Sequence, residues 1–264
     1  MVKLSDNPLR FKDFLDQKAQ QYESIDFIHS DPIQIPHRFR LKEDIEIMSF
    51  LVTTIAWGHR KSIINSGLQM IDLFEGCPYD FVINHSLKDL SRFKDFVHRT
   101  FQNEDMIYFI RALQMIYKEK GGLQQLFSIN RSHNHLYETI HHFKKEFFSL
   151  PHLKRTRKHL SDPLKGSASK RINLFLRWMV RSSRRKVDFG IWDNIPSSKL
   201  SCPLDIHTHQ VALKLGLITR KMTDFKTLVE LDTNLRKLDS IDPVKYDFAL
   251  FGLGAFENFQ SRNH

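Results

Sequence analysis

The spacing of apolar residues is the feature that most constrains the fold of this chain. These residues recur every three or four positions almost throughout, as in the series Ile45, Met48, Val52 and Ile55. A helix that buries one face shows this spacing, whereas a strand alternates apolar and polar residues at every second position. The sequence therefore predicts an all-α protein. Its 264 residues are enough for one large domain or two lobes with a substantial core.

Positive charge is concentrated in one part of the sequence. The chain has a formal net charge of +10, and residues 144–186 hold 14 Lys and Arg against two acidic residues, a balance of +12. The other 221 residues therefore sum to −2. Such a run is often only a solvated basic face, but apolar residues at helical spacing interrupt this one, which predicts a folded basic surface. This surface favours a polyanionic partner.

The composition excludes several other classes of protein. Cys77 and Cys202 are the only cysteines, too few for a disulfide framework or for a four-cysteine zinc or iron–sulfur site. The longest stretch without Asp, Glu, Lys or Arg, residues 47–59, is shorter than the roughly 20 residues of a membrane-spanning helix. Residues 1–10 contain no apolar signal core. We therefore expect a cytoplasmic protein that needs no membrane.

Two segments carry the candidate chemistry. The first reads Gly-Ser-Ala-Ser-Lys-Arg at residues 166–171, and small residues at the head of a helix let a phosphate approach its N–H groups. The helix that follows should place Lys170, Arg177, Arg181 and Arg184 on one face, opposite an apolar face.

The second segment, residues 203–217, begins Pro-Leu-Asp-Ile-His-Thr-His. Asp205 is in a good N-cap position there, where the helix dipole and N–H groups favour its anion, and Asp242 before Pro243 is a second expected cap.

Together these segments resemble the helix-hairpin-helix DNA glycosylase superfamily, the endonuclease III and 8-oxoguanine glycosylase group. The family's hairpin Gly-x-Gly-x-Lys matches at Gly166 and Lys170, with Ala168 in place of the second glycine. Its later pattern, Pro-x-Asp-x-His-x-x-x-Val-x-x-Lys/Arg-Leu-Gly, matches throughout residues 203–216. Looser similarity at residues 51–58 and 249–255 extends the resemblance over roughly residues 40 to 256.

The resemblance implies a fold and a set of roles. The fold would be a single two-lobed helical domain over residues 1–264 with a cleft between its lobes, and residues 160–217 would hold the hairpin and active site. Lys170 would be the nucleophile that forms a Schiff base, and Asp205 would stabilise positive charge on the sugar. DNA would be bound by the hairpin and nearby side chains: Gly166, Ser167, Ala168, Ser169, Arg171, Arg177, Arg181, His207, Trp57 and His59. Of these, Trp57 or His59 would fill the space left by a flipped base, although a core position is the plainer reading of Trp57.

The activity implied is excision of a damaged base from double-stranded DNA by a monomeric enzyme, with strand nicking by β-elimination. The 35 positions between Lys170 and Asp205 are similar to the enlarged hairpin region of the archaeal 8-oxoguanine branch, which favours an oxidised purine. No cofactor is expected, because the cysteine quartet of the iron–sulfur members is absent.

Three alternatives compete with this interpretation. A helix-hairpin-helix protein could bind nucleic acid without any glycosylase chemistry. Asp205-x-His207-x-His209 also spells a motif of metal-dependent amidohydrolases, but the 55 residues after His209 cannot complete a (β/α)8 barrel. The histidine pairs at residues 133–135 and 141–142 lack acidic or cysteine partners at ligand spacing, so no metal site is predicted.

Overall fold

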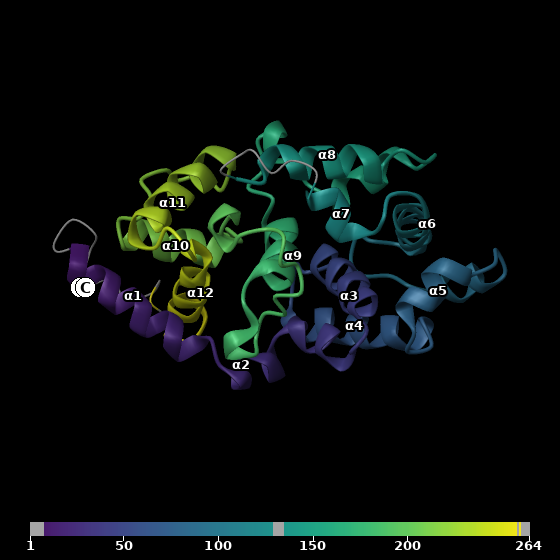
Figure 1. The fold of residues 1–264 in the computed structure, drawn as a ribbon, viewed down its shortest axis with the longest axis horizontal. Coiled ribbons are helices and arrows are strands. Elements are labelled where there is room, and N and C mark those ends of the chain that lie inside the picture. Colours follow the sequence, from purple (N-terminus) through teal and green to yellow (C-terminus); the bar gives the residue numbers. More distant parts are fainter. Residues whose placement is uncertain (1–7, 129–134, 258, 260–264) are drawn as a thin grey trace. The chain divides into compact units, whose positions relative to one another are not determined.

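The computed structural model describes residues 8–128, 135–257 and 259 (Figure 1). Within these residues the regular structure is helical, and β pairing is limited to two isolated bridges. The all-α prediction is confirmed. The α-helices are α1 (Pro8–Tyr22), α2 (Ile25–Ser30), α3 (Lys42–Thr54), α4 (Arg60–Leu73), α5 (Pro78–Asn84), α6 (Asn103–Glu119), α7 (Leu123–Ser128), α8 (Tyr137–Phe147), α9 (Lys170–Val180), α10 (Ile206–Lys214), α11 (Phe225–Leu238) and α12 (Tyr246–Ala255).

Short 3-10 helices lie between many of these elements. They are η1 (Pro32–Gln34), η2 (Pro36–Arg38), η3 (Asp89–Phe93), η4 (Lys154–His159), η5 (Pro163–Lys165), η6 (Ser183–Arg185), η7 (Ser197–Lys199) and η8 (Pro243–Lys245). In the described part of the chain, no helix is both long and apolar enough to cross a membrane.

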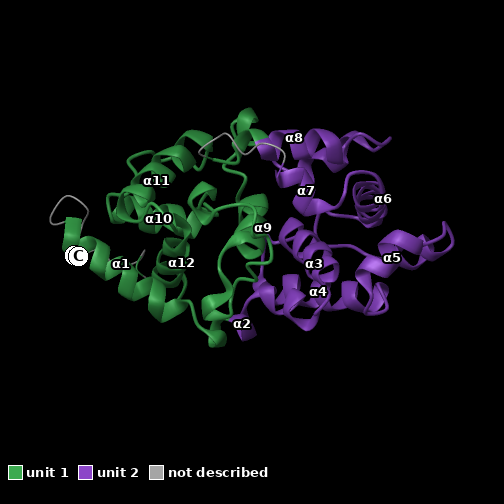
Figure 2. Ribbon diagram, in the orientation of Figure 1, with its two compact units in different colours: residues 1–27, 132–138, 162–264 green, residues 28–131, 139–161 purple. Residues whose placement is uncertain are grey.

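The chain divides into two compact units, shown in separate colours in Figure 2. Unit 1 comprises residues 1–27, 132–138 and 162–264, and unit 2 comprises residues 28–131 and 139–161. Each unit is therefore assembled from segments that are far apart in the sequence. All the contacts described below lie within one unit.

Unit 2 is organised around α3, whose residues from Ile45 to Thr54 are all buried. Aromatic rings surround this helix: Phe50 stacks on Phe109 and meets Phe147 edge-on, with ring centres 5.8 and 5.4 Å away. Asp105, at the start of α6, connects this core to η4, because its carboxylate accepts hydrogen bonds from Thr156 and His159.

Unit 1 is organised around α12, which packs against α1 and α10. The α1 contact requires a glycine, because a Cβ at Gly252 would lie 2.1 Å from the Tyr22 ring. The helix is apolar apart from Asp247 in its first turn. Since a carboxylate is almost never buried without a partner, Asp247 marks the place where this core holds polar groups.

The two predicted aspartate caps have different outcomes. Asp205 caps α10 as expected, accepting hydrogen bonds from the backbone N–H groups of His207 and Thr208, both at 2.9 Å. Asp242 precedes the helical turn η8 but makes no side-chain cap. Its carboxylate binds the Arg181 guanidinium instead, at 2.9 and 3.0 Å from Nε. That cap prediction was wrong because a buried arginine outcompetes the helix N–H groups for the carboxylate.

Candidate functional site

Lys170 and Asp205 form the centre of the candidate site in unit 1. Lys170 is the first residue of α9 and Asp205 is the N-cap of α10, so each side chain projects from a helix start. The Lys170 Nζ lies 3.4 Å from Asp205 Oδ2, and the two side chains are 32% and 20% exposed. The structure thus brings together the two predicted catalytic residues across 35 positions of sequence and leaves both accessible to a ligand.

The two carboxylate oxygens of Asp205 have different partners. Oδ1 accepts both helix N–H hydrogen bonds, whereas Oδ2 faces the lysine ammonium. Since the backbone hydrogen bonds hold the carboxylate in one orientation, the oxygen that faces Lys170 is preorganised for interaction with a positive charge.

Asp247 is a third carboxylate of this site and was missed by sequence analysis. Its side chain is buried and accepts a hydrogen bond from Arg177 Nη1. Burial raises the pKa of Asp247 to about 6; Arg177 opposes the rise and the negative charge of Asp205 adds to it. A single acidic residue in the otherwise apolar helix 246–255 is the sequence signal that could have found it.

Cys202 connects Asp247 to the segment that leads into α10. Its thiol donates a hydrogen bond to Asp247 Oδ1 over 3.7 Å, and its backbone N–H donates to Asp232 Oδ1 at 3.0 Å. Burial, with Asp247 and Asp232 nearby, raises the pKa of Cys202 well above its ordinary value. The side chain is therefore a neutral hydrogen-bond donor that holds the Asp205 segment against α12.

Arg177 and Arg181 do not form the predicted DNA-binding face. Both are buried, and Arg177 binds Asp188 and Asp247 while its guanidinium carbon lies 4.3 Å from the Phe248 ring centre. Arg181 binds Glu23, Asp188 and Asp242. Burial opposes the charge of Arg181, but these carboxylates outweigh it and raise the pKa of Arg181.

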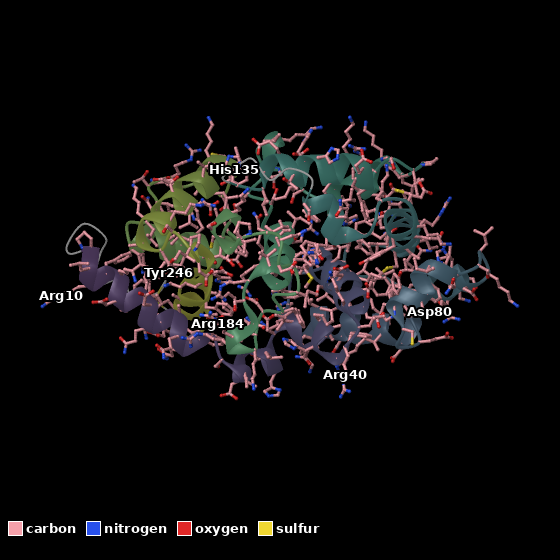
Figure 3. The ribbon with its side chains drawn as sticks, viewed as in Figure 1. Arg10, Arg40, Asp80, His135, Arg184 and Tyr246 are labelled. Atoms are coloured by element: carbon pink, nitrogen blue, oxygen red, sulfur yellow. The ribbon has the colours of Figure 1, made fainter. Side chains whose placement is uncertain are left out.

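The expectation of a phosphate-binding arginine stripe was wrong because carboxylates from distant segments neutralise it. The sequence count of +12 over residues 144–186 could not include these partners. Arg184, labelled in Figure 3, is the exposed member of the predicted face.

The hairpin at residues 166–169 is closed by its own hydrogen bonds. The N–H groups of Gly166, Ser167 and Ser169 donate to Pro163 O, Asp162 O and Ser167 Oγ. Ala168 and Ser169 are buried, whereas Gly166 is exposed with φ +89°. Internal acceptors therefore already satisfy three N–H groups of this turn, which leaves fewer of them for a phosphate than the sequence suggested.

The remaining predicted contacts of unit 1 lie close to the Lys170–Asp205 pair in sequence. Arg171, the second residue of α9, is half-buried, and burial lowers its pKa to about 10. His207 is exposed in the first turn of α10. Both stay predictions as DNA contacts.

Trp57 and His59 lie in unit 2. Trp57 is partly buried, stacked on His159 at 6.0 Å and edge-on to His98 at 5.3 Å between ring centres. It therefore packs in the unit, as the plainer interpretation expected. His59 is exposed just before α4, so it is the better placed of the two to reach a ligand.

The competing metal-site motifs find no support in the described residues. His209 is buried and its Nε2 lies 2.9 Å from Arg220 O, whereas His207 is exposed, so the Asp-x-His-x-His residues do not converge. They also lie on a helix rather than on a barrel strand. Across the described residues, no three His, Cys, Asp or Glu side chains are grouped to hold a metal; His133 lies outside those residues.

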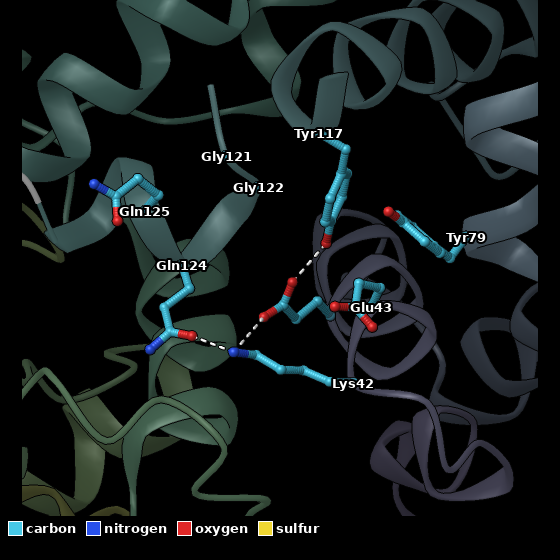
Figure 4. A pocket seen from close by; sticks show the side chains of 9 residues that line it. Lys42, Glu43, Tyr79, Tyr117, Gly121, Gly122, Gln124 and Gln125 are labelled. Carbon is cyan, nitrogen blue, oxygen red and sulfur yellow. Dashed lines mark hydrogen bonds and ion pairs between the residues drawn. The ribbon is translucent and has the colours of Figure 1, made fainter. Parts of the chain in front are cut away.

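A pocket of about 260 Å³ lies within unit 2 (Figure 4). Its buried Glu46 carboxylate accepts a hydrogen bond from Tyr117 at 2.6 Å and lies 3.9 Å from the Lys42 ammonium. No residue predicted from the sequence lines it. The pocket is lined by Lys42, Glu43, Glu46, Tyr79, Tyr117, Gly121, Gly122, Gln124 and Gln125.

Fold and site together define an all-α protein in which a helix-capping aspartate meets a lysine from the head of a second helix. The family model described as "Protein of unknown function (DUF2400)" matches residues 31–256, and the chain belongs to this family. The matched region contains Lys170, Asp205 and Asp247. No curated protein and no solved structure matches the chain.

Proposed function

We propose that this protein is a DNA base-excision glycosylase with a Schiff-base lyase activity. Lys170 is the nucleophile and Asp205 stabilises the positive charge that develops on the sugar. The observation that carries the proposal is the 3.4 Å separation of two partly exposed side chains that the resemblance to helix-hairpin-helix glycosylases names as the catalytic pair.

The chemistry follows from the charges of the pair. Lys170 must lose a proton before Nζ can attack C1′ of the nucleotide, and the Asp205 carboxylate is close enough to accept it. As the bond from C1′ to the base nitrogen breaks, its electrons leave with the base, which takes the proton from Asp205, so the carboxylate is ionised again while positive charge develops on the sugar. The nitrogen now bound to C1′ carries two protons, and one moves to the ring oxygen as the bond from C1′ to that oxygen breaks, which leaves the protonated Schiff base.

The substrate contacts that support this proposal are fewer than the sequence suggested. Gly166 and His207 are exposed and lie within four positions of the pair in the sequence, and Lys165 is exposed immediately before the hairpin. Arg177 and Arg181 are buried and bind carboxylates within unit 1 instead. Binding to double-stranded DNA should therefore depend on a small number of exposed cations and weaken as salt is added.

Borohydride trapping on DNA that contains an abasic site tests the proposal most simply, because this substrate bypasses the unknown lesion. Wild-type protein should form a covalent adduct. Lys170→Arg should form none, since a guanidinium keeps the positive charge beside Asp205 but cannot form the Schiff base. Lys165→Arg is the matched control, because it makes the same substitution at an exposed lysine five positions away, keeps the charge available for DNA binding and should trap normally.

A panel of lesion-bearing duplexes, with oxidised purines first, then identifies the base that is excised. If DNA binds but neither the abasic site nor any lesion gives an adduct or a released base, the protein is a nucleic-acid-binding member without chemistry. Adduct formation that survives in Lys170→Arg would reject Lys170 as the nucleophile.

A further inference from the structure

A closed ring of contacts surrounds the Lys170–Asp205 pair in unit 1. Asp205 lies three positions after Cys202, whose thiol donates to Asp247, and Asp247 in turn accepts from Arg177. Arg177 is on the same helix as Lys170, two turns away, and Lys170 returns to Asp205. Asp247 is thus connected to the catalytic pair from both sides, through α9 and through the segment that enters α10.

The ring belongs to a larger network of ion pairs, whose buried members are two arginines and three carboxylates: Arg177, Arg181, Asp188, Asp247 and Glu23. Every member forms an ion pair with another member of the opposite charge. The basic members are Lys170, Arg177, Arg181 and Arg185, and the acidic members are Asp205, Asp247, Asp188, Glu23 and Asp242. An excess carboxylate in a desolvated network favours retention of one proton.

Asp247 is the member best suited to hold that proton. It is buried and its ion pair is with one arginine, whereas Asp188 is shared by Arg177 and Arg181. The groups that act on it are Arg177 and Lys170 from α9, and Cys202 and Asp205 from the segment before α10.

We propose that Asp247 is a positioning residue for the Lys170–Asp205 pair, and that its proton controls the charge that Lys170 experiences. The effect of Asp247 on the reaction rests on the proposed function, whereas its coupling to Lys170 can be measured without it. When Asp247 is neutral, Asp205 supplies the negative charge that faces Lys170. When Asp247 ionises, a second negative charge in a poorly solvated site favours the ammonium form, which is not nucleophilic.

The raised pKa of Asp247, about 6, places this change close to neutral pH. The direction is that of a buried acid: its proton is retained below about pH 6 and lost above it. The geometry alone leads to the same expectation. A buried carboxylate with one cationic partner should be the last acid of the network to lose its proton as pH rises.

Coupling between the two residues is measured by NMR on protein whose lysines carry reductively added ¹³C-methyl groups. The Lys170 signal is assigned by its absence in Lys170→Arg. Titrated from pH 4.5 to 8.5, it should show an inflection near pH 6 in the wild type and none in Asp247→Asn. Asp232→Asn is the matched control, because Asp232 is another buried carboxylate bonded to Cys202, and it should leave the inflection in place.

Two further variants exclude other sources of the inflection. Asp205→Asn should retain it, and so should His207→Gln, which removes the exposed imidazole two positions after Asp205. Loss of the inflection in either variant, or its absence from the folded wild type, would overturn the role of Asp247. These outcomes remain decisive even if Asp247→Asn does not fold.

Trapping on abasic DNA then measures the consequence. At pH 7.5 the Asp247→Asn protein should form the adduct faster than wild type, on the order of tenfold, because it lacks the second negative charge. Unchanged or slower trapping in a folded Asp247→Asn protein would reject control by this charge. An NMR inflection without any trapping would retain the coupling and reject the proposed function.

Discussion

A single carboxylate, Asp205, serves both the fold and the proposed reaction. One oxygen caps the N-terminus of α10 and the other faces Lys170. The helix cap therefore fixes the direction in which the charge points. The same division makes the two roles separable, because an asparagine retains the acceptor oxygen and lacks the charge.

Asp205→Asn should leave the free energy of unfolding within about 0.5 kcal/mol of wild type, since Asn and Asp cap helices about equally well. Base excision should fall by about 10²- to 10³-fold, because the developing sugar cation loses its counter-charge. Urea unfolding and single-turnover excision measure the two effects. Asp205→Ala is the comparison, and it should lose the cap as well, at about 1 kcal/mol. Full activity in Asp205→Asn would contradict the role of the charge.

Arg177→Ala should lower the free energy of unfolding by about 3–5 kcal/mol, because it leaves Asp188 and Asp247 buried without this cation. Exposed Arg184→Ala, on the same predicted face, should change it by less than about 0.5 kcal/mol. Denaturant unfolding checks both. A stable Arg177→Ala protein with weakened DNA binding would restore the surface role that the sequence pattern suggested.

In the hairpin before α9, the local sequence determines the turn, whereas a tertiary contact determines where the turn is attached. Gly166 adopts a left-handed conformation and ends η5. Its carbonyl accepts the Phe225 N–H, so the turn is fastened to the start of α11 rather than left open. This contact comes from 59 positions away and has no signal in the hairpin motif itself.

Gly166→Ala should cost about 1 kcal/mol of unfolding free energy, since a Cβ at φ +89° is strained although it meets no atom within 4 Å. Gly216→Ala, at φ +73° and equally open after α10, should cost about the same. Affinity for abasic DNA should fall only in Gly166→Ala, because Gly166 adjoins the proposed site. Equal losses of affinity in the two variants would argue against a hairpin contact.

The sequence could predict the elements and the central pair, but not the polar core around them. Helical spacing and the Asp205 cap are local properties, so the all-α class and the start of α10 were predictable. The pairing of Arg177 with Asp247, and of Arg181 with Glu23, joins positions 70 and 158 residues apart. Periodicity places such arginines on a polar face, but only the tertiary fold shows that this face is buried.

Across the whole molecule, the number of basic residues is larger than the number of cations available to a ligand. Buried or half-exposed arginines in both units bind carboxylates, as Arg181 does in unit 1 and Arg155 does with Asp105 in unit 2. Some of the 40 Lys and Arg are thus required by the interior, although these ion pairs leave the net charge of +10 unchanged. Stability should accordingly depend on carboxylates that remain ionised.

Acid should destabilise the protein between about pH 4 and pH 2, with Asp105 as a principal cause. Burial alone would raise its pKa, but hydrogen bonds from His159, Gln102 N–H and Thr156 outweigh burial and lower the pKa to about 2. The folded state therefore favours the carboxylate. Its contribution is present above the ordinary aspartate range and is lost as pH falls towards 2. Urea midpoints at pH 5 and pH 2.5 should converge in Asp105→Asn, and an unchanged difference would contradict this assignment.

The role of Lys170 as the nucleophile is tested most directly by identifying the residue that is covalently attached to abasic DNA after borohydride reduction. Peptide mass spectrometry of the trapped complex should place the adduct on Lys170, and Lys170→Arg should abolish it while Lys165→Arg leaves it unchanged. An adduct on any other residue, or no adduct from protein that binds the same DNA, would contradict the assignment of Lys170 and Asp205 as the active site.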